Sequence, residues 1–291
     1  MSKTILITGT SNGFGNDIAK TLAATGHRVF ATMRDVNGRH RAVAQDLKAE
    51  GVETLELDVT DQASVDAAFA ELYAKTGGTL DVLVNNAGIA AGGIQETFTP
   101  EQTRAMFDVN VFGIQRVTNA ALPAMHKVKA GLIINIGSIL GRVTLPFFAL
   151  YGASKHAVEA MTEGYRYELS QSGIDVVLIQ PGPYPTKLYN PGVIQSPVNT
   201  DRAANYGNLP QLQAGFEQWL GGLFASEGAP DPHDVAKAIV DVVAKPSGAR
   251  PNRVVVGLPF GADAANAAIE PLQAKLVADI GMAHLDQLKT P

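Results

Sequence analysis

Three residues of this sequence have the types and the spacing to act together chemically: Ser138, Tyr151 and Lys155. Residues four apart on a helix lie one above the other, so a helix here puts the Tyr151 hydroxyl and the Lys155 ammonium on one face. A nearby cation favours the phenolate and lowers the phenol pKa from its usual value of about 10. Tyr151 can then serve as a general acid or base, although a chance pair on a solvated helix face has the same spacing.

Ser138 gives the Tyr/Lys pair a structural context. It ends the apolar run that begins at Leu132, and it stands 13 residues before Tyr151. Such a run is typical of a buried strand, with Ser138 at its carboxyl end. Ligands of open α/β sheets bind at that edge, so the sequence indicates one site that combines the serine with the pair.

The composition is that of a globular protein, with 291 residues of which 46% are hydrophobic. A net charge of -5 argues against nucleic-acid or anionic-membrane partners, and the lack of cysteine excludes disulfides and thiolate metal sites. The short apolar run at the N-terminus is unlike a signal peptide, and no run approaches about 18 apolar residues. We therefore expect a cytoplasmic enzyme without a metal.

Strands and helices alternate along the chain. Residues 5–7 indicate a strand, residues 8–15 a glycine-rich loop and residues 17–23 a helix. Such a loop can approach a pyrophosphate, although the spacing Gly9-x-x-x-Gly13-x-Gly15 alone does not establish a cofactor site. Further strands are expected at 27–33, 52–57, 80–84, 132–138, 174–180 and 253–257. The alternation predicts an α/β fold with a Rossmann-type, doubly wound parallel sheet.

Several motifs together resemble the short-chain dehydrogenase/reductase family in its ordinary, non-extended branch. In chain order they are the loop from Thr8 to Gly15, Asp58-Val59, Asn85-Asn86-Ala87-Gly88, Asn110, Ser138, Tyr151 with Lys155, and Pro181-Gly182 with Thr186. The resemblance extends to about Gly257. It implies a reversible hydride transfer between a nicotinamide cofactor and an alcohol/carbonyl pair.

The resemblance also implies a catalytic set of Asn110, Ser138, Tyr151 and Lys155. Tyr151 exchanges a proton with the substrate oxygen, and Lys155 lowers the Tyr151 pKa and binds the nicotinamide ribose. Ser138 donates a hydrogen bond to the carbonyl oxygen. Asn110 bends its helix and holds a water that leads toward the lysine, whereas His156 points away on the helix and is not counted.

The cofactor contacts carried over from the family motifs are Gly9, Ser11, Asn12, Gly13, Phe14, Gly15, Arg34, Asp58, Val59, Asn86, Ala87, Gly88, Tyr151, Lys155, Pro181, Gly182 and Thr186. At the end of the second strand, NAD-binding units carry an acidic residue, but here Met33 is followed by Arg34. A guanidinium pairs well with a 2′-phosphate, so the sequence favours NADP(H). Asp35 keeps NAD(H) possible.

We expect a single domain over residues 1–291. Residues 1–137 form mainly the dinucleotide-binding half, and residues 138–257 form the catalytic half. Within it, the irregular segment from about 187 to 229 is interpreted as a substrate lid. Residues 258–291 form an alanine-rich, helical extension whose role the sequence does not indicate. Side chains expected around an apolar pocket are Tyr184, Leu188, Tyr189, Phe147 and Phe148.

Residues 28–35 are similar to steroid- and retinol-type reductases of the family, which favours a bulky apolar substrate. Two alternatives remain, a non-catalytic NADP(H)-binding sensor and an epimerase or dehydratase. The intact Ser/Tyr/Lys/Asn set counts against the sensor, and the glycine spacing counts against the epimerase. On the helix over 149–170, Ala157, Ala160, Met161 and Gly164 form one stripe whose small residues allow close helix packing. The family resemblance implies a homodimer or homotetramer that uses this helix, and core packing within one chain is the alternative.

Overall fold

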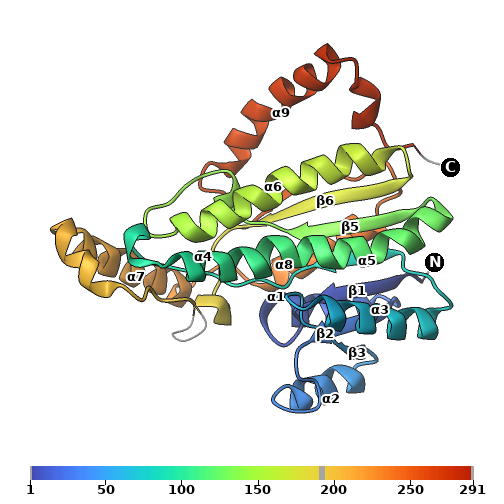
Figure 1. Ribbon diagram of the computed structural model, residues 1–291, viewed down its shortest axis with the longest axis horizontal. Helices are drawn as coiled ribbons and strands as arrows, with labels where there is room; N and C mark the ends of the chain where they lie inside the picture. Colours follow the sequence, from blue (N-terminus) through green and yellow to red (C-terminus); the bar gives the residue numbers. More distant parts are fainter. Residues whose placement is uncertain (1, 190–193, 290–291) are drawn as a thin grey trace.

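The computed structural model describes residues 2–189 and 194–289 (Figure 1). In this part of the chain, seven parallel strands form one sheet in the order β3-β2-β1-β4-β5-β6-β7. The strands are β1 (Thr4–Thr8), β2 (Arg28–Met33), β3 (Glu53–Glu56), β4 (Val82–Asn85), β5 (Gly131–Ile136), β6 (Ile174–Pro181) and β7 (Arg253–Val256). The order reverses between β1 and β4, which confirms the predicted doubly wound sheet and sets the edge where a ligand binds.

Helices cover both faces of the sheet, so the central strands are apolar on both sides. On one face lie α1 (Gly13–Ala24), α2 (Arg41–Ala49) and α8 (His233–Ala244), which pack on side chains such as Ile7. On the other face lie α3 (Gln62–Thr76), α5 (Gly113–Val128) and the end of α6 (Ala149–Ser170), which pack on side chains such as Leu6. Successive strand residues thus point to opposite layers of the core.

A helix irregularity separates α4 (Pro100–Phe107) from α5. Thr99 and Gln102 form a reciprocal cap at the start of α4, and residues Asp108–Phe112 form a π-helical turn. Within this turn the Asn110 amide donates to the Ile89 carbonyl and accepts from the Ile89 amide, each at 2.9 Å. A side chain that bonds to the backbone of another segment is a known cause of such an irregularity, and the π-helical turn lies where a bend was predicted at Asn110.

The segment predicted to be irregular contains a long helix. It holds two 3₁₀ turns, Lys187–Tyr189 and Thr200–Tyr206, followed by α7 (Leu209–Ala225), while residues 190–193 of the predicted lid lie outside the described part. Its apolar residues Phe216, Leu220 and Phe224 recur at helical spacing, a signal obscured by the surrounding glycine and glutamine. Leu220 is the buried residue of α7, and the helix projects from one end of the molecule (Figure 1).

The chain beyond β7 is helical, as predicted. α9 (Ala262–Asp279) extends away from α6 in Figure 1, and its buried residues are Ala262, Asn266 and Val277. After α9, a 3₁₀ turn at Ala283–Asp286 returns to α6, where Asp286 lies 2.6 Å from Arg166. Among the described residues, no helix has both the length and the apolar character needed to cross a membrane.

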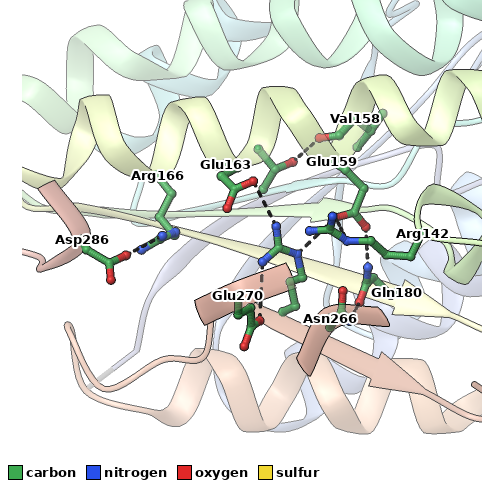
Figure 2. A network of polar contacts seen from close by, with 11 residues as sticks. Arg142, Val158, Glu159, Glu163, Arg166, Gln180, Asn266, Glu270 and Asp286 are labelled. Atoms are coloured by element: carbon green, nitrogen blue, oxygen red, sulfur yellow. Dashed lines mark hydrogen bonds and ion pairs between the residues drawn. The ribbon is translucent and has the colours of Figure 1, made fainter. Parts of the chain in front are cut away.

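A buried polar network joins α6, β6, β7 and α9 (Figure 2). Glu159 of α6 is 4% exposed and accepts from Arg253 at 3.1 Å, with the Arg142 guanidinium also at 3.1 Å. Gln180 donates to the other oxygen of Glu159 and accepts from Asn266 at 2.7 Å. The carboxylate is thus compensated by two cations, and α9 is tied to the end of β6.

Candidate active site

A cavity of about 340 Å³ lies along the carboxyl ends of the strands. Every residue predicted to contact the cofactor lines it except Gly15. Ser138 lines it too, whereas Asn110 does not. Lining residues that the sequence did not indicate as cofactor contacts include Met33, Arg39, His40, Ile89, Ile136, Gly137, Leu188 and Tyr189. The residues predicted from the motifs therefore lie around one cavity, and Gly15 and Asn110 lie just behind its wall.

The loop between β1 and α1 leaves space for a ligand backbone. Gly9 has φ +71°, and an added Cβ would lie 2.7 Å from the Cα of Ala87. Gly15 packs behind the cavity against the Asn86 amide, and only glycine fits there because any side chain would collide with that amide. Gly13 has φ +57° and faces open space. The Asn12 side chain does not cap α1, so the first-turn amides are available to an anion, and the loop fits a dinucleotide pyrophosphate.

The two asparagines at the end of β4, Asn85 in the strand and Asn86 directly after it, connect neighbouring strand ends, as predicted. The Asn86 amide donates to the carbonyls of Thr8 and Gly9 at 2.9 and 3.0 Å. Asn85 donates to the Asn135 side chain at 2.9 Å. Because these bonds join β4 to β1 on one side and to β5 on the other, they fix the relative positions of the two halves of the site.

The far end of the cavity is positively charged. Arg34, Arg39 and His40 line it, after the end of β2, together with Asp58 after β3. Burial of Asp58 raises its pKa, but hydrogen bonds from Thr60 and the nearby arginines outweigh this effect and hold the pKa below its usual value. Asp58 therefore remains ionised at neutral pH and faces Arg34 at 3.8 Å.

Asp35 does not line the cavity. It has φ +52°, and its carboxylate accepts from the Arg39 backbone amide at 3.0 Å. The Arg39 side chain lies 3.8 Å from the same carboxylate. Asp35 thus holds the turn from residue 35 to 40, and this turn brings Arg39 and His40 beside Arg34. The sequence could not indicate this arrangement, because it depends on how the turn closes.

Ser138, Tyr151 and Lys155 converge from β5 and α6, and all three are buried. The Lys155 ammonium donates to the Ile136 carbonyl at 2.8 Å and lies 5.7 Å from the centroid of the Tyr151 ring. Ser138 accepts from the Leu140 amide at 3.1 Å, which fixes the position of its hydroxyl oxygen and leaves its O–H free to donate. Burial lowers the pKa of Lys155 to about 8.

The phenol pKa of Tyr151 differs from the prediction. Burial raises it above its usual value, Tyr189 adds to the increase, and the Ser138 hydroxyl opposes it. The expected decrease in the presence of Lys155 was wrong for the protein alone, because the ammonium is bonded to the Ile136 carbonyl and desolvation of the phenol dominates. The spacing in sequence cannot reveal such a desolvation.

The loop after β6 forms the opposite wall. The Gly182 amide donates to the Val256 carbonyl at 2.9 Å, and a side chain on Gly182 would collide with the Leu258 carbonyl. Tyr184 packs edge-on against Phe14 with ring centroids 5.4 Å apart. Its buried hydroxyl finds no hydrogen-bond partner in the described chain. Tyr184 therefore braces the glycine loop. It lines this cavity and not the separate apolar hollow beside Ser138, so its predicted place around an apolar pocket was wrong, as were those of Leu188 and Phe147.

Beside Ser138 a second hollow opens, of about 30 Å³. Ser138, Gly182 and Tyr189 line both the hollow and the larger cavity. Its other lining residues are Ile139, Leu140, Leu145, Phe148, Pro183, Phe216, Trp219, Leu220 and Phe260. The site thus has a large arm lined by both polar and apolar groups and a small apolar arm, and the two meet at the serine.

Residues 3–194 match the family model described as short chain dehydrogenase. The chain belongs to the short-chain dehydrogenase/reductase family. It is an oxidoreductase of that family, and the parallel sheet with its strand-end motifs is the scaffold that the resemblance implied. Among the described residues, no three or more His, Asp or Glu side chains are grouped as a metal site.

Curated relatives include the 3-ketodihydrosphingosine reductase of Bacteroides thetaiotaomicron, 38% identical over 182 residues. That match covers 62% of this chain and 64% of the relative. Human retinol dehydrogenase 8 is 33% identical over 251 residues, which cover 83% of this chain and 78% of the relative. The predicted similarity to retinol-type members of the family is confirmed by this second relative.

A short-chain dehydrogenase from Streptomyces avermitilis has a TM-score of 0.74 at 31% identity, with 98% of both chains covered. Actinorhodin polyketide ketoreductase with NADPH has a TM-score of 0.73 at 27% identity, covering 90% of this chain and 97% of the other. A 3-ketoacyl-(acyl-carrier-protein) reductase from Brucella melitensis complexed with NADH has a TM-score of 0.71 at 26% identity, covering 88% and 98%. These similarities support a nicotinamide cofactor.

Proposed function

We propose that this oxidoreductase transfers a hydride between NADP(H) and an alcohol/ketone pair with a bulky apolar substrate. The observation that carries the proposal is that Ser138, Tyr151 and Lys155 line the large cavity together, and that Ser138 also lines the apolar hollow beside it. The cavity has the lining expected for the dinucleotide, and the hollow has the lining expected for the carbon skeleton of the substrate.

The residues around the junction then have distinct roles. A bound nicotinamide supplies or accepts the hydride. Ser138 donates a hydrogen bond to the carbonyl oxygen, and Tyr151 supplies the proton to the same oxygen. The raised pKa of Tyr151 keeps the phenol protonated at neutral pH, which is the form needed for reduction.

Oxidation of an alcohol needs the phenolate form of Tyr151, and Lys155 is the cation within reach of its ring. In this proposal Lys155 would hold the nicotinamide ribose when the cofactor is bound, and its positive charge near Tyr151 favours the phenolate. Asn110 retains the role that the family resemblance implies, holding a water that leads to the lysine. Its amide is already bonded to Ile89 and to Ser154, so its orientation is fixed.

The preference for NADP(H) is supported by the cationic end of the cavity. Arg34, Arg39 and His40 line this end, whereas Asp35 is engaged in its own turn. A 2′-phosphate beside two guanidinium groups gains charge-assisted hydrogen bonds, while a ribose hydroxyl gains less.

The test is to titrate the purified protein with NADPH and with NADH. Arg34→Ala is expected to weaken NADPH binding about tenfold and NADH binding less than about twofold, since a hydrogen bond to a charged group contributes about 1.5–3 kcal/mol. Arg41→Ala is the matched control, because Arg41 is exposed on α2 and does not line the cavity. An unchanged NADPH/NADH affinity ratio in Arg34→Ala would refute the assignment.

We also propose that the protein is a homodimer or homotetramer. On α6, Ala153 and Ala160 are exposed and Gly164 is partly exposed, so a second helix can approach closely. Light scattering on the full chain would measure the mass directly. The assignment of residues 1–137 and 138–257 to two functional halves of one domain, and a cytoplasmic location, stay predictions from the sequence.

A further inference from the structure

Five aromatic side chains line the apolar hollow, of which Tyr189 also lines the larger cavity. The other four, Phe148, Phe216, Trp219 and Phe260, follow one another in ring contact and are here called the aromatic wall. Phe216 lies with its ring centroid 6.0 Å from Phe148 and 5.6 Å from Trp219. Trp219 in turn lies 6.2 Å from Phe260. The four residues come from three separate segments: the loop before α6, the helix α7 and the loop between β7 and α9. The C-terminal extension, which begins at residue 258, therefore contributes a side chain to the site.

The hollow offers no partner for a charged ligand. None of the described residues that line it carries a charge, and its polar side-chain groups are the hydroxyls of Ser138 and Tyr189 together with the indole nitrogen of Trp219. A carboxylate or phosphate inside the wall would lose its hydration without gaining a counterion, which costs several kcal/mol. The chemistry of the hollow thus selects an uncharged group, and its flat side chains suit an apolar ring system.

Strained backbone occurs at two points of this region. Phe260 has φ +43°, and Phe147, whose ring centroid is 6.4 Å from Phe216, has φ +69°. Bulky residues rarely adopt positive φ, and such strain persists only where the surrounding structure fixes it, often at ligand-binding sites. The Phe260 ring lines the hollow, whereas Phe147 does not line it and only packs behind it against Phe216. The strain at Phe260 indicates that this residue of the wall has a function beyond packing.

The position of Phe260 is fixed from behind. Ala262 is fully buried and belongs to the same apolar cluster as Tyr151. One helical turn later, Asn266 donates to Gln180, which is bonded to the buried Glu159 (Figure 2). Gln180 directly precedes Pro181 and Gly182 of the cavity wall. The polar network therefore anchors the start of α9 to the floor of the site and holds Phe260 at the rim.

The opposite side of the wall is weakly held. Trp219 is 51% exposed, and α7 has Leu220 as its buried residue. The hollow of about 30 Å³ is too small for a ring, so a ring-sized group needs the wall to widen, and the exposed Trp219 on the weakly held α7 is the part best placed to move outward. Phe260 and Phe148 then form the fixed side, and α7 forms the moving side.

We propose that the aromatic wall selects uncharged carbonyl compounds whose apolar ring system adjoins the carbonyl, with Phe260 and Trp219 as specificity-determining residues. This inference rests on the proposed function, because it identifies the part of the substrate that leaves Ser138 and Tyr151 free to act on the oxygen. It assigns to the C-terminal extension the role of supplying and anchoring one side of the substrate pocket.

The first test compares steady-state kinetics with trans-1-decalone, which is bicyclic, and with 2-butanone, which has no ring. Phe260→Ala is expected to raise KM for trans-1-decalone about tenfold, the equivalent of one lost aromatic contact, and to leave KM for 2-butanone within about twofold. Leu272→Ala is the control, since Leu272 is 68% exposed on α9, and it should change neither value. Equal changes for both ketones would overturn the proposal.

A charged analogue tests the same wall independently. 4-Oxocyclohexanecarboxylate is expected to have a KM at least about tenfold above that of cyclohexanone in the wild-type protein, because the carboxylate finds no counterion. A carboxylate accepted as well as cyclohexanone would contradict the assignment. If Phe260→Ala does not fold, Phe260→Leu carries the comparison, with a smaller but still selective increase in KM for trans-1-decalone.

A readout without turnover separates this inference from the proposed function. Trp219 is the one tryptophan of the 291-residue sequence, so its fluorescence reports directly on the wall. If no ketone is reduced but trans-1-decalone still changes Trp219 emission, and does so less in Phe260→Ala, the wall binds apolar rings and the hydride-transfer proposal fails. If trans-1-decalone does not change Trp219 emission, and Phe260→Ala does not change the KM for trans-1-decalone, the wall has no role in recognition.

Discussion

Lys155 is a buried cation, and its burial makes the stability of the protein depend on pH. The residue is 5% exposed, and burial lowers its pKa from 10.5 to about 8. Between these two values the unfolded chain binds more protons at this site than the folded chain does. The free energy of unfolding must therefore rise as the pH increases through this range. Below about pH 8 the lysine is charged in both states, and the full cost of burying the charge is present.

The size of the effect follows from the shift in pKa. A change from 10.5 to about 8 corresponds to about 3 kcal/mol, at about 1.36 kcal/mol per pKa unit. Between pH 7 and 9.5, the unfolding free energy of the wild type should therefore rise by about 2 kcal/mol relative to Lys155→Met, which cannot titrate at this position. All other groups titrate in both proteins and cancel from the difference to first order.

The assay is urea unfolding of the cofactor-free protein at pH 7, 8.25 and 9.5, for the wild type and for Lys155→Met. Lys237→Met is the control, because the Lys237 side chain is 57% exposed and should give no such trend. The claim that Lys155 is held desolvated in the free protein would be refuted by either of two results. The difference in unfolding free energy between wild type and Lys155→Met could stay constant within about 0.5 kcal/mol from pH 7 to 9.5, or it could decrease as the pH rises.

Two further predictions concern buried polar groups. Tyr184→Phe should raise the free energy of unfolding by about 1 kcal/mol in urea denaturation, because it removes a buried hydroxyl without a partner in the described chain; a loss of stability would show that the hydroxyl is satisfied in solution. Glu159→Gln should lower the free energy of unfolding by about 3 kcal/mol, because Arg142 and Arg253 would then lie close together without the Glu159 carboxylate between them. Glu163→Gln, whose side chain is more exposed, should cost less than about 1 kcal/mol, and equal losses in the two variants would contradict the central role of Glu159.

Much of the fold could be predicted because the strands and their ends have strong local signals. Apolar runs that end in polar or glycine residues marked β1, β4 and β5, and their carboxyl ends meet at one edge of a parallel sheet. The same reasoning predicted that Ser138 and Tyr151 lie in one site, and in the structure both line one cavity. Asn110 could be predicted to distort its helix because a buried amide needs hydrogen-bond partners. In the structure these partners are the backbone groups of Ile89.

The parts that could not be predicted depend on contacts between distant segments. Arg39 reaches the cavity only because Asp35 closes a turn, and Phe260 reaches the hollow only because Asn266 is anchored to Gln180. The raised pKa of Tyr151 likewise comes from desolvation by surrounding segments, which outweighs the spacing to its lysine neighbour. Local pattern located the groups that we propose to react, and tertiary packing set their electrostatics.

The most direct test of the account compares the reduction of trans-1-decalone by the wild type and by Tyr151→Phe, with NADPH binding measured on the same samples. Proton transfer by a positioned side chain contributes about 10²–10⁴-fold to a rate, so turnover should fall by at least about 10²-fold in the variant. The affinity for NADPH should stay within about threefold, since the substitution removes one hydroxyl at one end of the cavity. Turnover that remains within about threefold of the wild type in a folded Tyr151→Phe protein would contradict the assignment of Tyr151 as the proton donor.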